Sequence, residues 1–376
     1  MEIKLLTSLS DINAQQWNEL VKDNNPFVRY EFLNALEVNG CVDQSFGWIP
    51  RHIAIYEHDR LVAACILYEK HNTYGEFVFD HAWSDAYQRN GLEYFPKLVS
   101  CIPYNPIQGQ RFLCQPGREE EIFPILLNAI QEIARQYQYS SFHCLFASEY
   151  EQEWFQSQDL LSRHDCQFHW FNQNYQSFDD FLSTFSSRKR KNIRKERERV
   201  KQAGVSFRVL DGYTSSDKDW QDFTRFYLKT FSEKWGMATL NEAFFKQVAK
   251  LIPDQVVLVL ADLNDECIAG ALMYKSDTHL YGRFWGCDIE LEYLHFEACY
   301  YQGIDFCIEQ GLNKFEPGAQ GEHKIARGFI PTLTRSSHWL SAPYFQKPIE
   351  VFTQQEKLAI KDYMENLSQH IPYKKS

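Results

Sequence analysis

The sequence predicts a mixed α/β protein in which one domain fold occurs twice. The same order of helical and strand patterns runs through both halves of the chain, and aromatic residues stand at matching places. A length of 376 residues is enough for two domains with separate cores. Hydrophobic residues make up 44% of the chain and aromatic residues 16%, which excludes an intrinsically disordered protein.

The strand patterns of the two halves match each other. Residues 52–70 place apolar, β-branched and aromatic positions on either side of a polar turn, which predicts two strands. Residues 73–80 predict a third strand. Residues 256–275 and 279–288 repeat this order in the second half. Each half is therefore expected to contain a three-stranded meander.

Helical patterns flank these strands in the same order in both halves. Two helical segments precede the strands, and a longer helix and one more strand follow them. Trp17 and Trp220 stand at like positions in the first helix of each half. We therefore place the domains at 1–165 and 166–376, and expect the second to end in a helix within 348–367.

The cellular compartment is predicted from the N-terminal sequence, the apolar runs and the spacing of the cysteines. No run approaches the ~18 uncharged apolar residues that span a bilayer, and the first residues do not follow a signal-peptide pattern. The ten cysteines are scattered, without a CxxC pair or zinc-finger spacing. We interpret them as reduced core residues, expect no metal site, and place the protein in the cytoplasm.

The charge is unevenly distributed along the chain. The net charge is −11, yet residues 188–201 carry nine Lys and Arg against two Glu, so the rest carries about −18. An acidic body does not favour polyanions, so DNA is not an expected partner. Any phosphate-bearing partner is expected to bind at this one segment.

This basic segment, 186–204, predicts one helix that begins near Ser186 and ends at a glycine. Like charges four residues apart disfavour a helix by about 0.2–0.5 kcal/mol per pair, so a compensating partner is expected. The candidate phosphate-binding positions are Arg188, Lys191, Arg194 and Lys195. The alternative is a solvated helix that folds onto acidic patches of the protein.

Several long motifs resemble those of a known family. They are NPFVRYEFLNALE (25–37), TYGEFVFDHAWSDAY (73–87), YFPKL (94–98), SSRKRKNIRKERERV (186–200), YGRFWGC (281–287), HFEACYYQGIDFCIE (295–309) and GAQGEHKIARGF (318–329). In these motifs the chain resembles the peptidogalycan biosynthesis/recognition family, FemAB-like proteins of the GNAT acyltransferase superfamily. The resemblance covers nearly the whole chain and implies that the two repeats are tandem GNAT-like acyltransferase domains.

The resemblance also implies an activity. Fem-type transferases take an aminoacyl group from aminoacyl-tRNA, so the expected reaction transfers an acyl or aminoacyl group to an amine, such as that of a peptidoglycan precursor. The basic helix would then face the tRNA. The acetyl-CoA motif of GNAT enzymes is only half present, from Arg283 to Gly286. Acyl-CoA remains an alternative donor, and a non-catalytic protein that binds RNA or a phosphorylated glycan is a further alternative.

The segment 314–329 is the first candidate active site. Gly318 and Gly321 are expected to form a turn whose backbone N–H groups bind an anion. Lys324 matches the lysine that follows a glycine-rich turn in the Fem-type pattern, and the resemblance implies that it lies close to the reacting groups. Arg327 lies three residues further along and would contact an anionic part of a substrate.

Proton transfer requires a further group in the same segment. Direct transfer needs an acceptor for the proton of the attacking amine. Glu316 and Glu322 are the candidate bases, and the alternative is a group of the substrate itself. His323 is a candidate substrate contact.

Arg283 is a candidate substrate-binding residue on an aromatic strand. Burial of its charge requires a partner, which is either an anion of the substrate or a structural carboxylate, Glu297 or Glu316. Asp288 and His295 lie just beyond this strand and are expected to orient an amine.

The connection 79–111 in the first half is too long and too aromatic for a simple loop. Aromatic residues mixed with charges suit a sugar or peptide acceptor, and the candidate contacts are Trp83, Asp85, Lys97 and Arg111. The alternative is that these side chains fill the cleft between the halves. That cleft is where donor and acceptor are expected to meet.

Overall fold

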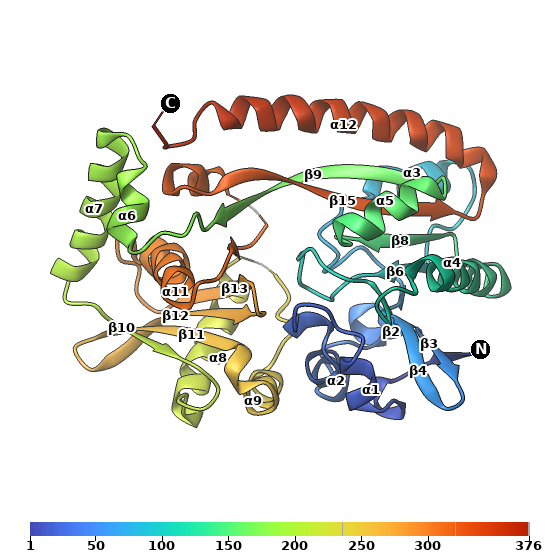
Figure 1. Cartoon of the computed structure of the whole chain (residues 1–376), viewed down its shortest axis with the longest axis horizontal. Coiled ribbons are helices and arrows are strands. Elements are labelled where there is room, and N and C mark those ends of the chain that lie inside the picture. Colours follow the sequence, from blue (N-terminus) through green and yellow to red (C-terminus); the bar gives the residue numbers. More distant parts are fainter. Residues whose placement is uncertain (235, 320, 375–376) are drawn as a thin grey trace. The chain divides into compact units, whose positions relative to one another are not determined.

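The chain contains both helices and strands, as the computed structural model in Figure 1 shows. The structure describes residues 1–234, 236–319 and 321–374; Gln320 of the GAQGEH motif therefore lies outside the described residues. The expected mixed α/β class is confirmed. Among the described residues, no helix is both long and apolar enough to span a lipid bilayer.

The chain divides into two units. Unit 1 comprises Met1–Asp165 and Leu333–Asp362, and unit 2 comprises Cys166–Thr332 and Tyr363–Ser376. We expected everything after residue 165 to form the second domain. Instead, Leu333–Asp362 belongs to unit 1, where its strand pairs with a strand of that unit, and only Tyr363–Ser376 returns to unit 2.

Unit 2 is built on a mixed sheet with the strand order β10-β11-β12-β13-β14-β9. The strands are β10 (Ser206–Leu210), β11 (Val256–Leu263), β12 (Glu266–Lys275), β13 (His279–Cys287), β14 (Lys314–Glu316) and β9 (Leu161–Phe171), of which the second half belongs to this unit. Strands β13 and β14 are parallel, and the other pairs are antiparallel. The meander expected in the second half is confirmed.

Helices cover this sheet. They are α6 (Phe178–Ser183), α7 (Ser187–Gln202), α8 (Asp217–Glu233), α9 (Glu242–Leu251), α10 (Leu294–Phe296) and α11 (Gln302–Gln310). A π-helical turn, Glu297–Tyr301, joins α10 to α11. Helix α7 confirms the predicted basic helix, and only its apolar residues Ile193 and Val200 are buried. Strand residues such as Val257 and Met273 form the core with Tyr301.

Unit 1 contains two sheets. One has the strand order β1-β3-β4-β7, and the other has the order β15-β8-β6-β5-β2. The strands are β1 (Glu2–Leu6), β2 (Trp48–Pro50), β3 (His52–Glu57), β4 (Arg60–Cys65), β5 (Tyr68–Lys70), β6 (Lys97–Ser100), β7 (Phe112–Cys114), β8 (Ser141–Leu145) and β15 (Ile330–Leu340).

The helices of unit 1 follow the predicted order, with two additions, His81–Arg89 and Glu149–Ser157. In chain order the helices are α1 (Ala14–Asn18), α2 (Tyr30–Val38), α3 (His81–Arg89), α4 (Glu119–Gln136) and α5 (Glu149–Ser157). The C-terminal helix α12 (Gln346–Ser368) confirms the helix expected within 348–367. Helix α3 was not expected, because the segment 79–111 had been interpreted as one long connection.

The prediction of a third strand at 73–80 is wrong. Gly75 has a φ of 82° and Phe77 a φ of 61°, values that an extended strand does not contain. Nζ of Lys70 donates a hydrogen bond to the carbonyl of Tyr74 at 3.1 Å, which stabilises the turn. The third strand of this half is β6, which begins only at Lys97.

The topology of the two halves confirms the internal repeat. In unit 1, β6 and β8 are parallel and α4 lies between them in sequence. In unit 2, β13 and β14 are parallel and α11 lies between them. The last strand of each half of the sequence pairs with a strand from the other half. Strand β9, at the end of the first half, pairs with β14, and β15, at the end of the second half, pairs with β8.

Candidate active site in unit 2

An opening in the unit 2 sheet begins where two parallel strands separate. The ladder between β13 and β14 ends at Tyr281 and Glu316, although β13 continues to Cys287. Pro317 has no N–H to continue the ladder, and Gly318 has a φ of 103°, so the chain turns away from β13. The residues beyond the ladder line a cavity of about 300 Å³.

A β-bulge places Arg283 on the wall of this cavity. Leu272 lies opposite Phe284 and Met273 lies opposite Gly282, so Arg283 is the extra residue of β13. Its Nε donates to the carbonyl of Gly282 at 2.7 Å. Burial lowers the pKa of Arg283 to about 10, so the guanidinium remains charged at neutral pH.

The cavity is rich in basic groups. Its lining includes the side chains of Lys234, Arg283, His295, His323 and Lys324. No aspartate or glutamate of the described chain lines it. An anionic group is therefore the charged ligand that this lining favours.

Lys324 lies in a short 3-10 helix, Glu322–Arg327, and is only 2% exposed. Its Nζ donates to the carbonyl of Gly318 at 2.6 Å. Burial, followed by the charge of Arg283, lowers the pKa of Lys324 to about 7. A lysine with this pKa can take up and release a proton near neutral pH.

Two histidines and a tyrosine form another part of the wall. The hydroxyl of Tyr300 lies 2.8 Å from Nε2 of His323, and the ring centroids of His295 and Tyr300 are 5.3 Å apart. Burial, with the nearby His323 and Lys324, lowers the pKa of His295 to about 4. This imidazole is therefore neutral at pH 7. His295 lines the cavity, and its expected role in orienting an amine stays a prediction.

The two predicted bases do not line the cavity. Glu316 is buried against Lys314, whose Nζ lies 2.8 Å from Oε1. Burial alone would raise the pKa of Glu316, but the charge of Lys314 outweighs it and lowers the pKa to about 2. Glu322 is exposed and accepts a hydrogen bond from Tyr363 at 2.8 Å. Neither carboxylate is placed to take a proton from a molecule in the cavity.

The other residues of the predicted segment have different positions. Gly318 lines the cavity, whereas Gly321 makes room for a neighbour, because an added Cβ would lie 2.4 Å from the His323 ring. Arg327 lies over the ring of Phe296 at 3.4 Å and forms an ion pair with Glu196 of α7 at 2.9 Å. Its guanidinium therefore connects the lysine segment to the basic helix.

Sequence reasoning did not identify three side chains of the wall. Tyr300 and Cys299 lie in the motif 295–309, which carried the family resemblance but suggested only a helix. Lys234 follows the end of α8, where no local pattern distinguishes it from a solvated lysine. Only the packing of α8 against β13 brings it to the site.

Arg111, a predicted substrate contact in unit 1, is a structural residue. It is buried, and its Nε donates to the carbonyl of Leu145 at 3.0 Å while Nη2 donates to that of Ile107 at 2.7 Å. Leu145 directly follows the last position of the β6–β8 ladder. A side chain thus occupies the place in unit 1 that corresponds to the opening beyond β13 and β14.

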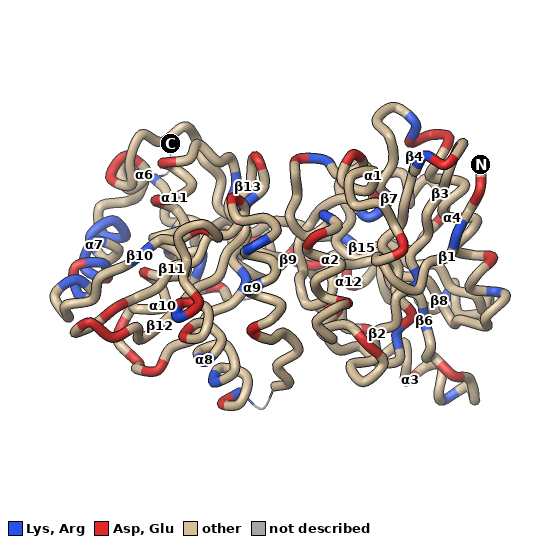
Figure 2. The backbone as a smooth tube through the Cα atoms, turned by 90° about the horizontal axis from the view of Figure 1, so that it is seen from below, with Lys and Arg blue, Asp and Glu red and all other residues tan. Residues whose placement is uncertain are grey.

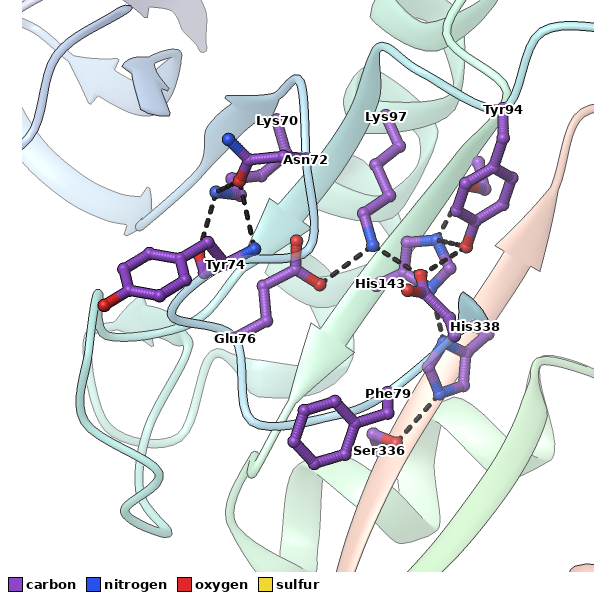
Figure 3. Close-up of polar contacts among 12 residues, drawn as sticks. Lys70, Asn72, Tyr74, Glu76, Phe79, Tyr94, Lys97, His143, Ser336 and His338 are labelled. Carbon is purple, nitrogen blue, oxygen red and sulfur yellow. Dashed lines mark hydrogen bonds and ion pairs between the residues drawn. The ribbon is translucent and has the colours of Figure 1, made fainter. Parts of the chain in front are cut away.

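The other three candidate contacts predicted in unit 1, Lys97, Trp83 and Asp85, differ in burial. Lys97 is buried, and its Nζ donates to carboxylates of Glu76, at 2.8 Å, and Asp80 (Figure 3). Trp83 is buried on α3, whereas Asp85 of the same helix is exposed. Lys97 is therefore part of a buried ion cluster and is not accessible to a substrate.

Helix α7 is the main concentration of basic residues in the chain, as Figure 2 shows. Arg194 pairs with Asp179 at 2.7 Å, and Arg197 pairs with Glu297 at 2.9 Å. Arg188, Lys191 and Lys195 are exposed and make no ion pair with the described residues. The alternative of a helix folded onto acidic groups therefore applies to only part of α7.

Solved structures share this fold. The structure of FemX superposes with a TM-score of 0.54 at 11% identity, over 93% of this chain and 100% of that one. The C-terminal domain (DUF2156) of a candidate lysylphosphatidylglycerol synthetase from Agrobacterium fabrum superposes with a TM-score of 0.55 at 11% identity, over 93% and 97%. No curated protein sequence matches the chain.

The family model for FemAB_like proteins, described as "Peptidogalycan biosysnthesis/recognition", matches residues 8–375. The chain belongs to this family. The family expected from the motifs is thus confirmed over almost the whole sequence.

Proposed function

We propose that the protein is an N-acyltransferase that moves an acyl or aminoacyl group from an ester or thioester to an amine in the unit 2 cavity. One observation carries this proposal. A bulged strand and a separated parallel strand open a cavity whose lining combines Arg283 with Lys324, a lysine of lowered pKa. Family membership supports a transferase of this kind.

The side chains of the cavity account for the steps of such a transfer. The nitrogen of the neutral amine attacks the carbonyl carbon, and Arg283 stabilises the negative charge that develops on the oxygen. The C–O or C–S bond then breaks. Neutral Lys324 takes the proton that the new amide nitrogen releases and passes it to the leaving oxygen or sulfur. No metal ion or organic cofactor takes part in these steps.

Aminoacyl-tRNA is the donor that the proposal favours. The exposed cations of α7, Arg188, Lys191 and Lys195, supply phosphate contacts without giving up existing ion pairs. Arg327 and Glu196 connect this helix to the segment that carries Lys324. The proposed acceptor is an amine of a peptidoglycan precursor, in line with the family description. Acyl-CoA is the second candidate donor.

A transfer assay distinguishes these donors. The purified chain is incubated with peptidoglycan precursor and either a mixed pool of aminoacyl-tRNA or acetyl-CoA, and the products are identified by mass spectrometry. We expect a mass increase of one aminoacyl residue with charged tRNA. Acetylation alone would assign the second donor. If no transfer occurs while charged tRNA binds with salt-dependent affinity, the protein is a binding protein and the enzymatic proposal is wrong.

A further inference from the structure

Unit 1 contains a separate cavity of about 270 Å³ that the transfer reaction does not use. Its lining includes Phe79, Arg163, Thr334, Ser336 and Glu356. We infer that this cavity binds an uncharged, polyhydroxylated ligand, a saccharide. This inference does not rest on the transfer proposed for unit 2.

The charges of the cavity balance one another. Arg163 and Arg335 contribute two cations, and Asp165 and Glu356 contribute two carboxylates. Both Nε and Nη2 of Arg163 donate to Glu356, the Nε bond being 2.9 Å long. His164 is neutral at pH 7, because burial and the nearby Lys357 lower its pKa to about 4. Unlike the basic unit 2 cavity, this lining does not select a charged ligand.

Two of the residues that line the cavity, Thr334 and Ser336, carry hydroxyl groups. The Oγ of Ser336 lies 2.8 Å from Nε2 of His338, and His338 in turn contacts His143 (Figure 3). Either partner of the Ser336–His338 pair can donate the shared proton. The hydroxyl of Thr334 is buried and has no hydrogen-bond partner within the described chain. Sugar hydroxyls both donate and accept, so they match such groups better than an ion does.

An exposed aromatic ring forms one wall. Phe79 is 60% exposed and lines the cavity together with Ser336, and its ring stacks on that of His81 with 6.1 Å between the centroids. Arg163 donates from Nη1 to the carbonyl of Phe79 at 2.9 Å, which fixes the backbone of this aromatic residue. The flat, apolar C–H face of a sugar ring packs on an aromatic face of this kind. Exposure of the apolar Phe79 ring to water is unfavourable, yet the backbone holds this ring at the rim of a polar cavity.

Buried hydrogen bonds hold the segment that carries Phe79 in place. Glu76 and Asp80 flank it in sequence, and both accept hydrogen bonds from the buried Lys97. Phe77, between these anchors, has a φ of 61°, and Phe146 of the cavity wall has a φ of 53°. Bulky residues rarely adopt this backbone conformation, and such conformations concentrate at ligand sites. A preorganised wall reduces the entropy lost on binding.

The size of the cavity agrees with one or two sugar rings. Small-molecule sites typically enclose about 300–1,000 Å³. The unit 1 cavity, at about 270 Å³, lies just below that range. A longer saccharide would extend past Phe79 into solvent.

Saturation-transfer difference NMR on the full-length chain tests the inference. The probes are N,N′-diacetylchitobiose and cellobiose as neutral saccharides, with glucose 6-phosphate as a charged one. We expect saturation transfer to a neutral disaccharide and none to the phosphate ester. Phe79→Ala, which changes an exposed side chain, and Thr334→Val, which keeps the shape of the residue, should each weaken binding at least fivefold. Tyr213→Ala, at an exposed ring of unit 2, is the matched control.

Each outcome of this experiment has a defined meaning. Binding that Phe79→Ala and Thr334→Val weaken while Tyr213→Ala does not supports the unit 1 saccharide site. The inference is overturned if all variants bind the disaccharide equally, if the phosphate ester is preferred, or if neither neutral disaccharide shows saturation transfer. Disaccharide binding is also measured on Lys324→Met, which removes the proposed proton acceptor of unit 2, and should be unchanged, so the two proposals fail independently.

Discussion

The Nζ atom of Lys324 lies 2.6 Å from the carbonyl oxygen of Gly318, across the turn that closes the unit 2 cavity. This contact places the lysine on the cavity wall while its side chain is only 2% exposed. Gly318 can serve this role because its φ of 103° turns its carbonyl in a way that residues with a Cβ rarely adopt. The turn and the lysine therefore act as one unit.

Replacing Lys324 separates its role in transfer from its role in stability. We expect Lys324→Met to reduce kcat/KM at least 100-fold, because general acid–base catalysis contributes about 10²–10⁴-fold. The same variant should melt about 2–4 °C higher at pH 6, since a buried cation is replaced by an apolar side chain of similar length. Lys250→Met, at an exposed lysine of α9, is the control and should change neither quantity.

The stability difference between Lys324→Met and the wild type should also depend on pH. The pKa of Lys324 is lowered in the folded state to about 7, from the ordinary lysine value of 10.5. Between these values the unfolded chain binds the proton and the folded chain does not, so wild-type stability rises with pH. The gap in melting temperature should be largest below pH 7 and narrow toward pH 10. A constant gap would show that the shift in pKa is absent.

Transfer activity should follow the same titration. If Lys324 takes up the proton, kcat of the wild type rises about tenfold per pH unit below pH 7 and levels off above it. Lys324→Arg keeps a cation that does not titrate in this range, and should remove the inflection. An unchanged inflection in Lys324→Arg would assign the titrating group to another residue.

Local patterns in the sequence predicted elements that depend on local properties. The meander at 256–288 and the basic helix have strong periodicity, and both are found in the structure. The pattern at 73–80 is equally strand-like, yet buried contacts with Lys70 and Lys97 fold it into a turn. Lys97 comes from a strand that only the tertiary fold brings near the segment, so a sequence window does not reveal its contact. Lys70 lies only four residues before Tyr74, but the strand pattern does not show that its side chain turns back to this carbonyl.

In the candidate site, too, some residues could be predicted from the local sequence and others depend on the tertiary fold. Arg283 and Lys324 were both identified from the sequence, and the structure places them on one cavity wall. Glu316 was chosen as a base because it is a carboxylate near the glycine turn, but its pairing with Lys314 depends on the direction of a strand side chain. Lys234 was missed because its proximity results from helix packing alone.

Arg283 should control the affinity for a negatively charged group. We expect Arg283→Lys to raise KM for the acyl donor about tenfold, because a lysine keeps the charge but loses the planar fork of donors. Arg283→Met should raise KM further and also lower kcat, as charge stabilisation in the transition state is lost. Steady-state kinetics with the donor varied separate the two effects. Equal KM values in all three proteins would place the anion elsewhere.

The exposed cations of α7 should determine binding of the tRNA donor. We expect Arg188→Gln/Lys191→Gln/Lys195→Gln to weaken tRNA binding at least tenfold at 0.1 M salt, and to reduce the slope of log K against log salt by about 2–3. Arg197→Gln is the contrasting variant, because this side chain is already paired with Glu297 and Asp305. It should alter stability more than the salt slope. A triple variant with an unchanged slope contradicts a phosphate-binding role for α7.

The ion cluster of unit 1 should contribute strongly to its stability. Lys97→Met leaves the buried carboxylates of Glu76 and Asp80 without their cation, which should destabilise the unit by about 3–5 kcal/mol. Urea unfolding measures this loss, and the triple variant Glu76→Gln/Asp80→Asn/Lys97→Met should recover part of it, because the carboxylates left without Lys97 are then neutral amides. Lys22→Met removes an exposed lysine that pairs with Glu119, and should cost less than about 1 kcal/mol. If Lys97→Met and Lys22→Met unfold at the same urea concentration, the buried cluster does not stabilise the segment that carries Phe79.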